Sequence, residues 1–310
     1  MNISQQQIGY ILSLIEHKNF GKAAEACFVT QPTLSMQIKK AEESLGFQVF
    51  NRNRNPLELT SFGEKLVPIL YDMQAEYDKI KRLTQKQLGK NVEEIRIGVI
   101  PTVASYLVPK LFQNKERFGE EVKFAVVELK TEDLLENLQL RKIDYGILAG
   151  PVSQENLHQT SLFNEEILIY CPEFDRQQEI HVNEIKFLHP WLLNGGNCLR
   201  TQMIQFCNLS EINDQNWNYE GGNLEMLIKM VDDYGGYTLI PSFYVANYEF
   251  NKKHLHTLIA DENEKVPARN IIGISSLKNA HHPVLKELSQ FIKLNFANLE
   301  QKKFEILSWK

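Results

Sequence analysis

The stretch FGKAAEACFVTQPTLSMQIKKAEESLGFQVFNRNRNPLELTSFG, residues 20–63, decides the fold of the first part of the chain. Its opening, Phe20–Phe28, indicates a short helix whose small residues allow close packing. Val29–Pro32 interrupts that helix, and Thr30 and Pro32 suit the N-cap and the first turn of another. In this next helix, which Gly46 ends, one apolar stripe faces a core. The stripe consists of Leu34, Ile38, Ala41 and Leu45.

A further amphipathic helix, Ser4–His17, precedes this stretch, and two short strands are expected over Val49–Thr60. Two short helices, a tight turn and a third helix with a basic outer face are typical of a helix-turn-helix, to which the strands add a wing. The third helix would enter the major groove of DNA, and Arg52 and Arg54 of the wing would reach phosphate or the minor groove. A small helical bundle with a solvated basic face is the alternative. The outer face holds Pro32, Ser35, Met36, Lys39 and Lys40.

Charge is spread unevenly over the 310 residues, whose net charge is −5. Residues 1–90 carry 12 Lys and Arg against 9 Asp and Glu, a net charge of +3, which leaves −8 for residues 91–310. A mildly basic first third can bind a polyanion. The composition is that of a soluble globular protein of two or three domains, without a membrane span. We expect no signal peptide and a cytoplasmic location, where any disulfide is transient.

One long helix is expected over Ser61–Leu88, followed by a hinge at Gly89–Asn91. Apolar residues recur along this helix at spacings of four and three, which suits a seam between two helices. We favour a homodimer, because a reader of two DNA half-sites needs two heads at a fixed separation. Packing against the chain's own body is the alternative. The apolar residues are Leu66, Leu70, Met73, Tyr77 and Ile80.

Beyond the hinge, strands alternate with helices, which predicts a parallel α/β sheet covered on both faces. We expect two lobes with the chain returning to the first: lobe I over about residues 91–164 and 266–300, lobe II over about 165–265. The expected strands are Glu94–Ile100, Val122–Leu129, Asp144–Ala149, Ile167–Tyr170, Gly236–Pro241 and Asn270–Ile274. The expected helices are Thr102–Gln113, Thr131–Leu140, Met226–Val231 and Pro283–Leu294.

Two cysteines bracket a short helix that is expected to start near Asn197, after Asn194–Gly196. Nine residues of helix place Cys198 and Cys207 on opposite faces, ~13 Å apart, so they can be bonded only if the helix unwinds. The unsatisfied N–H groups of the first turn would favour a thiolate at Cys198, which suggests an attacking and a resolving cysteine. Spacing alone favours the alternative, two unrelated buried thiols.

The stretch 20–63 resembles, almost position by position, the winged head of the LysR-type transcriptional regulators. The two lobes resemble the periplasmic-binding-protein-like effector domains of that family. The implied fold class is α/β, with a winged helix-turn-helix DNA-binding domain (1–60), a linker and dimerisation helix with its hinge (61–90) and a two-lobed regulatory domain (91–310). Many members carry an arginine where Met36 stands, which leaves open the bases that are read. The implied DNA-binding residues are Gln31, Pro32, Thr33, Ser35, Met36 and Lys39, with Arg52 and Arg54 on the backbone.

Within that family the chain is most similar to the peroxide-sensing members. The resemblance implies that Cys198 is the peroxidatic cysteine, that Cys207 is the resolving cysteine, and that a reversible disulfide joins them. It also implies that Thr102 and Thr131 hold hydrogen peroxide and that Arg269 favours the thiolate. The matching segments are Cys198–Arg200, Phe206–Cys207, Ile100–Val103, Thr131 and Arg269–Gly273.

The same resemblance implies the partners. These are promoter DNA, RNA polymerase, hydrogen peroxide as the signal, and glutathione with a glutaredoxin, or thioredoxin, as the reductant. A homodimer, assembled into a homotetramer, is expected, with no cofactor and no metal. One residue departs from the pattern: Asn197 stands where relatives have a histidine, and an amide cannot shuttle a proton.

Two other interpretations stay open. A regulator that binds a small metabolite between its lobes would leave the cysteines incidental, and a thiol peroxidase would use Cys198 as an enzymatic nucleophile. We expect Cys27 and Cys171 to be packing residues and His281–His282 to be a solvated loop pair rather than a metal site.

Overall fold

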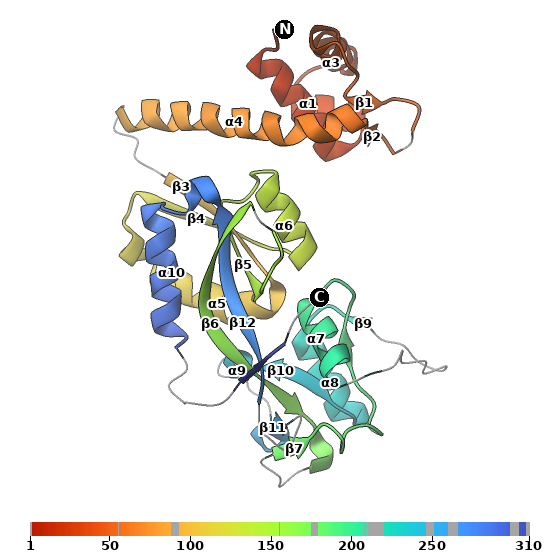
Figure 1. The fold of residues 1–310 in the computed structure, drawn as a ribbon, viewed down its shortest axis with the longest axis vertical. Coiled ribbons are helices and arrows are strands. Elements are labelled where there is room, and N and C mark those ends of the chain that lie inside the picture. Colours follow the sequence, from red (N-terminus) through yellow and green to blue (C-terminus); the bar gives the residue numbers. More distant parts are fainter. Residues whose placement is uncertain are drawn as a thin grey trace. The chain divides into compact units, whose positions relative to one another are not determined.

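The computed structural model describes residues 2–54, 56–87, 93–154, 156–174, 179–207, 209, 220–245, 251–259, 266–297 and 304–307. The chain divides into two compact units, residues 1–93 and, apart from the short turn 139–142, residues 94–310. Figure 1 shows the elements of each unit. The expected hinge at Gly89–Asn91 lies outside the described residues.

The first unit opens with three helices whose ends follow the capping signals of the sequence. Helix α1 (Gln5–His17) begins with a capping box between Ser4 and Gln7. After α2 (Phe20–Ala26), helix α3 (Gln31–Leu45) has Thr30 as its N-cap and ends at Gly46, whose φ is 78°. The expected stripe of α3 faces the core of this unit, with Leu34, Ile38 and Ala41 fully buried. The helix-turn-helix prediction is therefore confirmed.

A wing follows α3 and is tied to it by one buried carboxylate. Strands β1 (Phe50–Asn51) and β2 (Glu58–Leu59) pair in antiparallel. Glu42 of α3 accepts hydrogen bonds from the backbone N–H groups of Val49 and Phe50 at 2.8 and 3.3 Å. Its second oxygen accepts from the Arg52 guanidinium at 2.8 Å. Glu42 thus fixes the wing relative to α3 through charge-assisted bonds.

Helix α4 (Ser61–Gln87) confirms the predicted long linker helix, but its exposed apolar residues differ from the predicted ones. Leu70 is buried in the core of the first unit, and Leu66 packs against that core, so the predicted seam was wrong at these two positions. The apolar side chains that α4 leaves exposed recur at spacings of four and three and form a stripe suited to a second helix. They are Ile69, Met73, Tyr77, Ile80 and Leu83.

The second unit is built on one large sheet with the strand order β4-β3-β5-β12-β6-β11-β7, to which β10 adds on β6 and β13 on β12. Two short strands, β8 and β9, pair separately. The strands are β3 (Glu93–Val99), β4 (Val122–Glu128), β5 (Tyr145–Gly150), β6 (Leu157–Tyr170), β7 (Glu179–His181), β8 (Leu192–Leu193), β9 (Glu220–Gly221), β10 (Thr238–Pro241), β11 (Leu255–Ile259), β12 (Val266–Ser276) and β13 (Phe304–Ile306). The helices are α5 (Pro101–Gln113), α6 (Thr131–Gln139), α7 (Cys198–Phe206), α8 (Leu224–Tyr234), α9 (Ser242–Val245) and α10 (Pro283–Asn295).

The sheet is mixed, so the prediction of a parallel sheet was wrong. Strands β3 and β5 are parallel, but β12 runs antiparallel to both β5 and β6, and β6 runs antiparallel to β10 and β11. The long strands β6 and β12 pass from one lobe into the other (Figure 1). The alternation of strands and helices in the sequence had predicted separate short strands in their place. Because β6 leads from the first lobe to the second and β12 leads back, the two strands run in opposite directions and pair in antiparallel.

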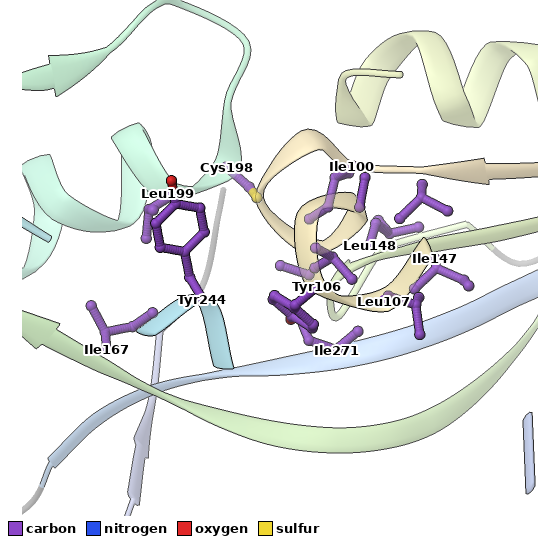
Figure 2. Packing of buried hydrophobic residues seen from close by; sticks show 14 of the residues in the cluster. Ile100, Tyr106, Leu107, Ile147, Leu148, Ile167, Cys198, Leu199, Tyr244 and Ile271 are labelled. Carbon is purple, nitrogen blue, oxygen red and sulfur yellow. The ribbon is translucent and has the colours of Figure 1, made fainter. Parts of the chain in front are cut away.

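The two lobes share one apolar cluster. Figure 2 shows side chains of α5 and β5 on one side and those of α7 and α9 on the other, with Cys198 between them. Cys198 is only 4% exposed, so the thiol belongs to the core and not to the surface. The two-lobed α/β prediction is confirmed, and its lobes meet at the cysteine.

We expect Glu42→Gln to destabilise the first unit by about 1.5–3 kcal/mol, the contribution of a hydrogen bond to a charged group. The amide must turn a donor toward either the Val49 N–H or the Arg52 guanidinium, because it offers one acceptor oxygen where the carboxylate has two. Urea unfolding would measure the change. Glu43→Gln is the matched control, since its exposed side chain only approaches Lys39 at 3.9 Å, and we expect less than about 0.5 kcal/mol. Equal effects of the two substitutions would contradict the assignment.

Candidate functional site

Helix α7 carries the two cysteines in the positions that the sequence predicted. Cys198 is its first residue and Cys207 directly follows its last, and both are free thiols that are 4% exposed. At ~1.5 Å per residue the helix holds their backbones ~13 Å apart. The reduced chain therefore keeps the two sulfurs from meeting.

The loop before α7 is held by polar contacts. Asn197 occupies the N-cap position, but its side chain makes no capping bond and instead donates to the Asn194 carbonyl at 3.1 Å. The Lys130 ammonium donates to the Gly195 carbonyl at 2.7 Å, and Arg200 donates to the Leu193 carbonyl at 2.8 Å. Asn197 is thus a structural residue of this loop, and it is buried beside Cys198.

Arg269 is completely buried and reaches the site from β12. Its Nε donates to Glu165 at 2.8 Å, one terminal nitrogen donates to the Thr102 hydroxyl at 2.7 Å, and the other donates to the Thr102 carbonyl at 3.1 Å. Arg269 and Glu165 stand directly opposite each other on β12 and β6. The structure therefore brings Thr102 and Arg269 together, as the resemblance implied.

Glu165 is a site residue that the sequence reasoning missed. Besides Arg269, its carboxylate accepts from the Tyr106 hydroxyl at 3.0 Å and from the Phe243 backbone N–H at 3.3 Å. The glutamate is fully buried, so these donors replace the water that it loses. The sequence alone does not single it out, because Glu165 stands between two other polar residues, Asn164 and Glu166, ahead of Ile167–Tyr170.

The pKa of Cys198 lies above its ordinary value, contrary to the expectation of a favoured thiolate. Burial raises the pKa and is the largest cause, since a thiolate in an apolar cluster lacks water. Arg269, the backbone N–H of Leu199 and the Thr131 hydroxyl all act in the opposite direction. The helix N-terminus and the guanidinium therefore work as predicted, but desolvation outweighs them.

Thr131, at the start of α6, brings an unpaired hydroxyl to Cys198. The side chain is 1% exposed, and its oxygen makes no well-formed hydrogen bond to any described residue. The same hydroxyl lies near enough to the Cys198 sulfur to lower the pKa of that thiol. A buried hydroxyl without a partner costs free energy, so it marks a place where a small polar molecule can bind.

Cys207 lies in an apolar surround. Burial raises the pKa of its thiol to about 12, against a smaller opposing effect of the neighbouring Tyr237 hydroxyl. The main cause of this raised pKa is burial, since a thiolate in an apolar surround lacks water.

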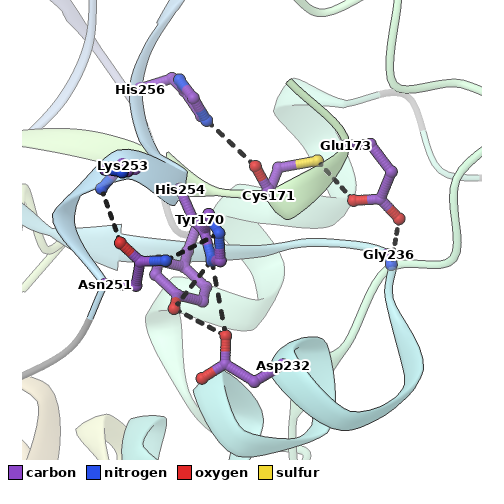
Figure 3. Close-up of polar contacts among 9 residues, drawn as sticks. All are labelled: Tyr170, Cys171, Glu173, Asp232, Gly236, Asn251, Lys253, His254 and His256. Carbon is purple, nitrogen blue, oxygen red and sulfur yellow. Dashed lines mark hydrogen bonds and ion pairs between the residues drawn. The ribbon is translucent and has the colours of Figure 1, made fainter. Parts of the chain in front are cut away.

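The other cysteines are packing residues. The Cys171 thiol donates to Glu173 at 3.2 Å, and the second Glu173 oxygen accepts from the Gly236 N–H (Figure 3). Burial, followed by this carboxylate, raises the pKa of Cys171 to about 12. Cys27 packs half-buried against the core of the first unit. Among the described residues, no group of three His, Cys, Asp or Glu side chains could hold a metal ion.

The predicted DNA-contacting face of α3 is accessible, but Arg52 is engaged elsewhere. Arg52 binds Glu42 and lies over the Phe20 ring at 5.9 Å, and 36% of its side chain is exposed. Arg54 is more open and approaches Glu58 at 3.7 Å. Gln31, Pro32, Met36 and Lys39 are exposed, and Thr33 and Ser35 are half-buried.

Comparison with known proteins agrees with this arrangement. The bacterial regulatory helix-turn-helix of the lysR family matches residues 5–64, and the LysR substrate binding domain matches residues 89–297. The chain belongs to the LysR family. It is therefore a DNA-binding transcription regulator and not an enzyme, and the thiol-peroxidase alternative is wrong.

The similar LysR-family proteins include hydrogen peroxide-inducible genes activators. That of Haemophilus influenzae is 29% identical over 300 residues, covering 94% of this chain and 98% of the relative. That of Dickeya chrysanthemi is 31% identical over 248 residues, covering 79% and 80%. Among solved structures, a full-length OxyR variant from Pseudomonas aeruginosa is similar in fold, with a TM-score of 0.72 and 24% identity over 94% of this chain and 98% of that one. Among the described residues of this LysR-family chain, no helix has both the length and the apolar character needed to cross a membrane.

We expect the LysR-family protein to lose stability as the pH rises above about 9, through Cys207. The unfolded thiol loses its proton near pH 9.0, whereas the folded thiol keeps it to about 12, so alkali favours the unfolded chain. At pH 10 the loss is about 1.4 kcal/mol relative to pH 8. Cys207→Ala should remove this part of the pH dependence of urea unfolding. Met203→Leu, a buried change on the same helix, should retain it, and an unchanged slope in Cys207→Ala would contradict the prediction.

Proposed function

We propose that this LysR-family regulator senses hydrogen peroxide through a reversible disulfide between Cys198 and Cys207. The observation that carries the proposal is the convergence of a buried guanidinium and an unpaired buried hydroxyl on one thiol: Arg269 and Thr131 at Cys198. The similarity to hydrogen peroxide-inducible genes activators supports it.

In the first step the sulfur of Cys198 attacks one peroxide oxygen. An S–O bond forms as the O–O bond breaks, and the departing hydroxide takes up the proton that the thiol lost, giving water and a sulfenic acid. Thr131 and Thr102 orient the peroxide by hydrogen bonds, and Arg269 stabilises the thiolate, whose pKa it lowers. Asn197 offers an amide in place of an imidazole, so the proton travels through the peroxide or water.

In the second step the sulfur of Cys207 attacks the sulfur of Cys198. The S–S bond forms, the S–O bond breaks, and the leaving hydroxide combines with the Cys207 proton as water. Because α7 holds the thiols ~13 Å apart, this step requires the helix to unwind. The oxidised chain then differs in local fold from the reduced chain, which makes α7 a two-state element of the kind that switches use.

The remaining assignments belong to the same proposal. Residues 1–60 bind promoter DNA with α3 in the major groove, residues 61–90 dimerise through the exposed stripe of α4, and residues 91–310 hold the sensor. Rearrangement of α7 changes the regulatory assembly, a homodimer or homotetramer, and so its contacts with DNA and RNA polymerase. Glutathione with a glutaredoxin, or thioredoxin, restores the thiols.

A small timed dose of hydrogen peroxide tests the redox step. We expect mass spectrometry to find one Cys198–Cys207 bond at near-stoichiometric oxidant, with Cys27 and Cys171 still reduced. Cys207→Ser should accumulate the sulfenic acid at Cys198, because the resolving thiol is missing. Cys198→Ser should leave the other thiols unoxidised. If Cys198→Ser kept its transcriptional response to peroxide, the proposal would fail.

Thr131→Val separates reactivity from stability. We expect sulfenic acid formation to slow by about ten-fold or more, since a donor to the peroxide is lost. The free energy of unfolding should stay within about 0.5 kcal/mol or rise, because the hydroxyl that is removed has no partner among the described residues. Thr102→Val is the contrasting control: it removes the hydroxyl that accepts one of the Arg269 hydrogen bonds, so this variant should both react more slowly and be less stable. Oxidation of Thr131→Val at the unsubstituted rate would argue against a peroxide site here.

A further inference from the structure

The last described segment of the chain is fastened beside Arg269. Strand β13, dark blue in Figure 1, pairs in parallel with the first residues of β12, Val266–Ala268. Leu307 follows β13, and its backbone N–H donates to the Ala268 carbonyl at 2.7 Å. Arg269 is the next residue of β12, so the tail is fixed one residue before the guanidinium.

Leu307 also binds helix α7. The side-chain Nε2 of Gln202 donates to the Leu307 carbonyl at 3.1 Å, and both residues are buried, at 0% and 8% exposure. Gln202 lies one helical turn after Cys198 and therefore on the same face of α7. Its Oε1 has no partner among the described residues, so the bond to Leu307 is what orients the amide there. Leu307 thus bridges the strand that carries Arg269 and the helix that carries Cys198.

We propose that Leu307 and Gln202 are positioning residues that keep α7 helical beside Arg269 and restrain the closure of the Cys198–Cys207 disulfide. This inference rests on the proposed function and adds a part of the chain that the cysteine chemistry does not touch. The tail acts as a latch on the second step of the reaction.

The latch acts selectively because the two steps make different demands on α7. Formation of the sulfenic acid leaves the helix in place, and the hydrogen bonds that hold Arg269, to Glu165 and Thr102, do not involve the tail. Closure removes the ~13 Å separation of the thiols by unwinding the helix, whose middle is Gln202. The buried bond from Gln202 to Leu307 must then break, so the tail raises the barrier to closure but not to sulfenic acid formation.

Two substitutions open the latch from opposite ends in the full-length protein. Leu307→Pro removes the N–H that fastens the tail to Ala268, and Gln202→Met removes the donor from α7 at similar length. After one equivalent of hydrogen peroxide, rapid quenching and mass spectrometry give the rates of sulfenic acid formation and of disulfide closure. We expect closure about five-fold faster in each variant, the rate equivalent of one net hydrogen bond, with sulfenic acid formation within about three-fold of the unsubstituted rate.

The double variant distinguishes the latch from general destabilisation. Leu307→Pro with Gln202→Met should close no faster than either single variant, because both act through one bond, whereas unrelated losses would add. Gln205→Met on the exposed side of α7 and Ile306→Ala on β13 are the matched controls and should close at the unsubstituted rate. Amide hydrogen exchange of α7 in the reduced protein should be faster in the latch variants, a measurement that needs no redox chemistry.

The outcomes separate the two proposals. If the unsubstituted protein forms neither sulfenic acid nor disulfide, the proposed function fails. If it oxidises as expected and both latch variants close at its rate, with unchanged exchange in α7, the tail inference is overturned and the sensor is not. Additive acceleration in the double variant would also overturn the inference.

Discussion

The ion pair between Arg269 and Glu165 is the constraint on which the proposed sensor site depends. Both side chains are completely buried, and each charge is tolerable only because the other, together with Thr102 and Tyr106, replaces lost water. The pair spans β12 and β6, the strands that run through both lobes. It therefore places a positive charge next to Cys198 inside an apolar cluster, where a cation alone would be expelled.

The opposing effects on the Cys198 pKa explain how the proposed sensor thiol can stay protonated at rest and still be stabilised as a thiolate when it reacts. Desolvation raises its pKa and keeps the resting sulfur protonated, while Arg269 and the Leu199 N–H offer the stabilisation that a developing thiolate needs. The helix supplies the second constraint, because Cys207 stands at its other end. In the proposed function, oxidation of the Cys198 sulfur is in this way separated from formation of the disulfide, because the helix must unwind between the two steps.

The features that sequence reasoning predicted are those encoded locally. The caps at Ser4 and Thr30, the stop at Gly46 and the stripe of α3 depend on residues within a few positions of one another, and the helix between the cysteines follows from an uninterrupted run. The resemblance supplied Thr102 and Arg269, which spacing could not place together across 167 positions.

The features that sequence reasoning missed depend on contacts between residues that are distant in the sequence. Glu165 becomes a site residue only because β6 lies against β12, and the antiparallel pairing of these strands is decided by the chain's return between lobes. Leu70 was assigned to the predicted seam of α4 because its spacing fits, but its side chain is buried in the core of the first unit. The net direction of the Cys198 pKa shift could not be read from a helix N-terminus, because burial is a tertiary property.

The depth of Cys198 has a consequence for which oxidants it can meet. With 4% of the residue accessible and apolar side chains around it, a reactant must shed its hydration shell and be no larger than a few atoms to arrive at the sulfur. In the proposed function, bulky organic hydroperoxides and peptide disulfides are excluded because they are too large to reach the buried sulfur. Selectivity among oxidants then comes from their size, so a small molecule can react even though it binds weakly.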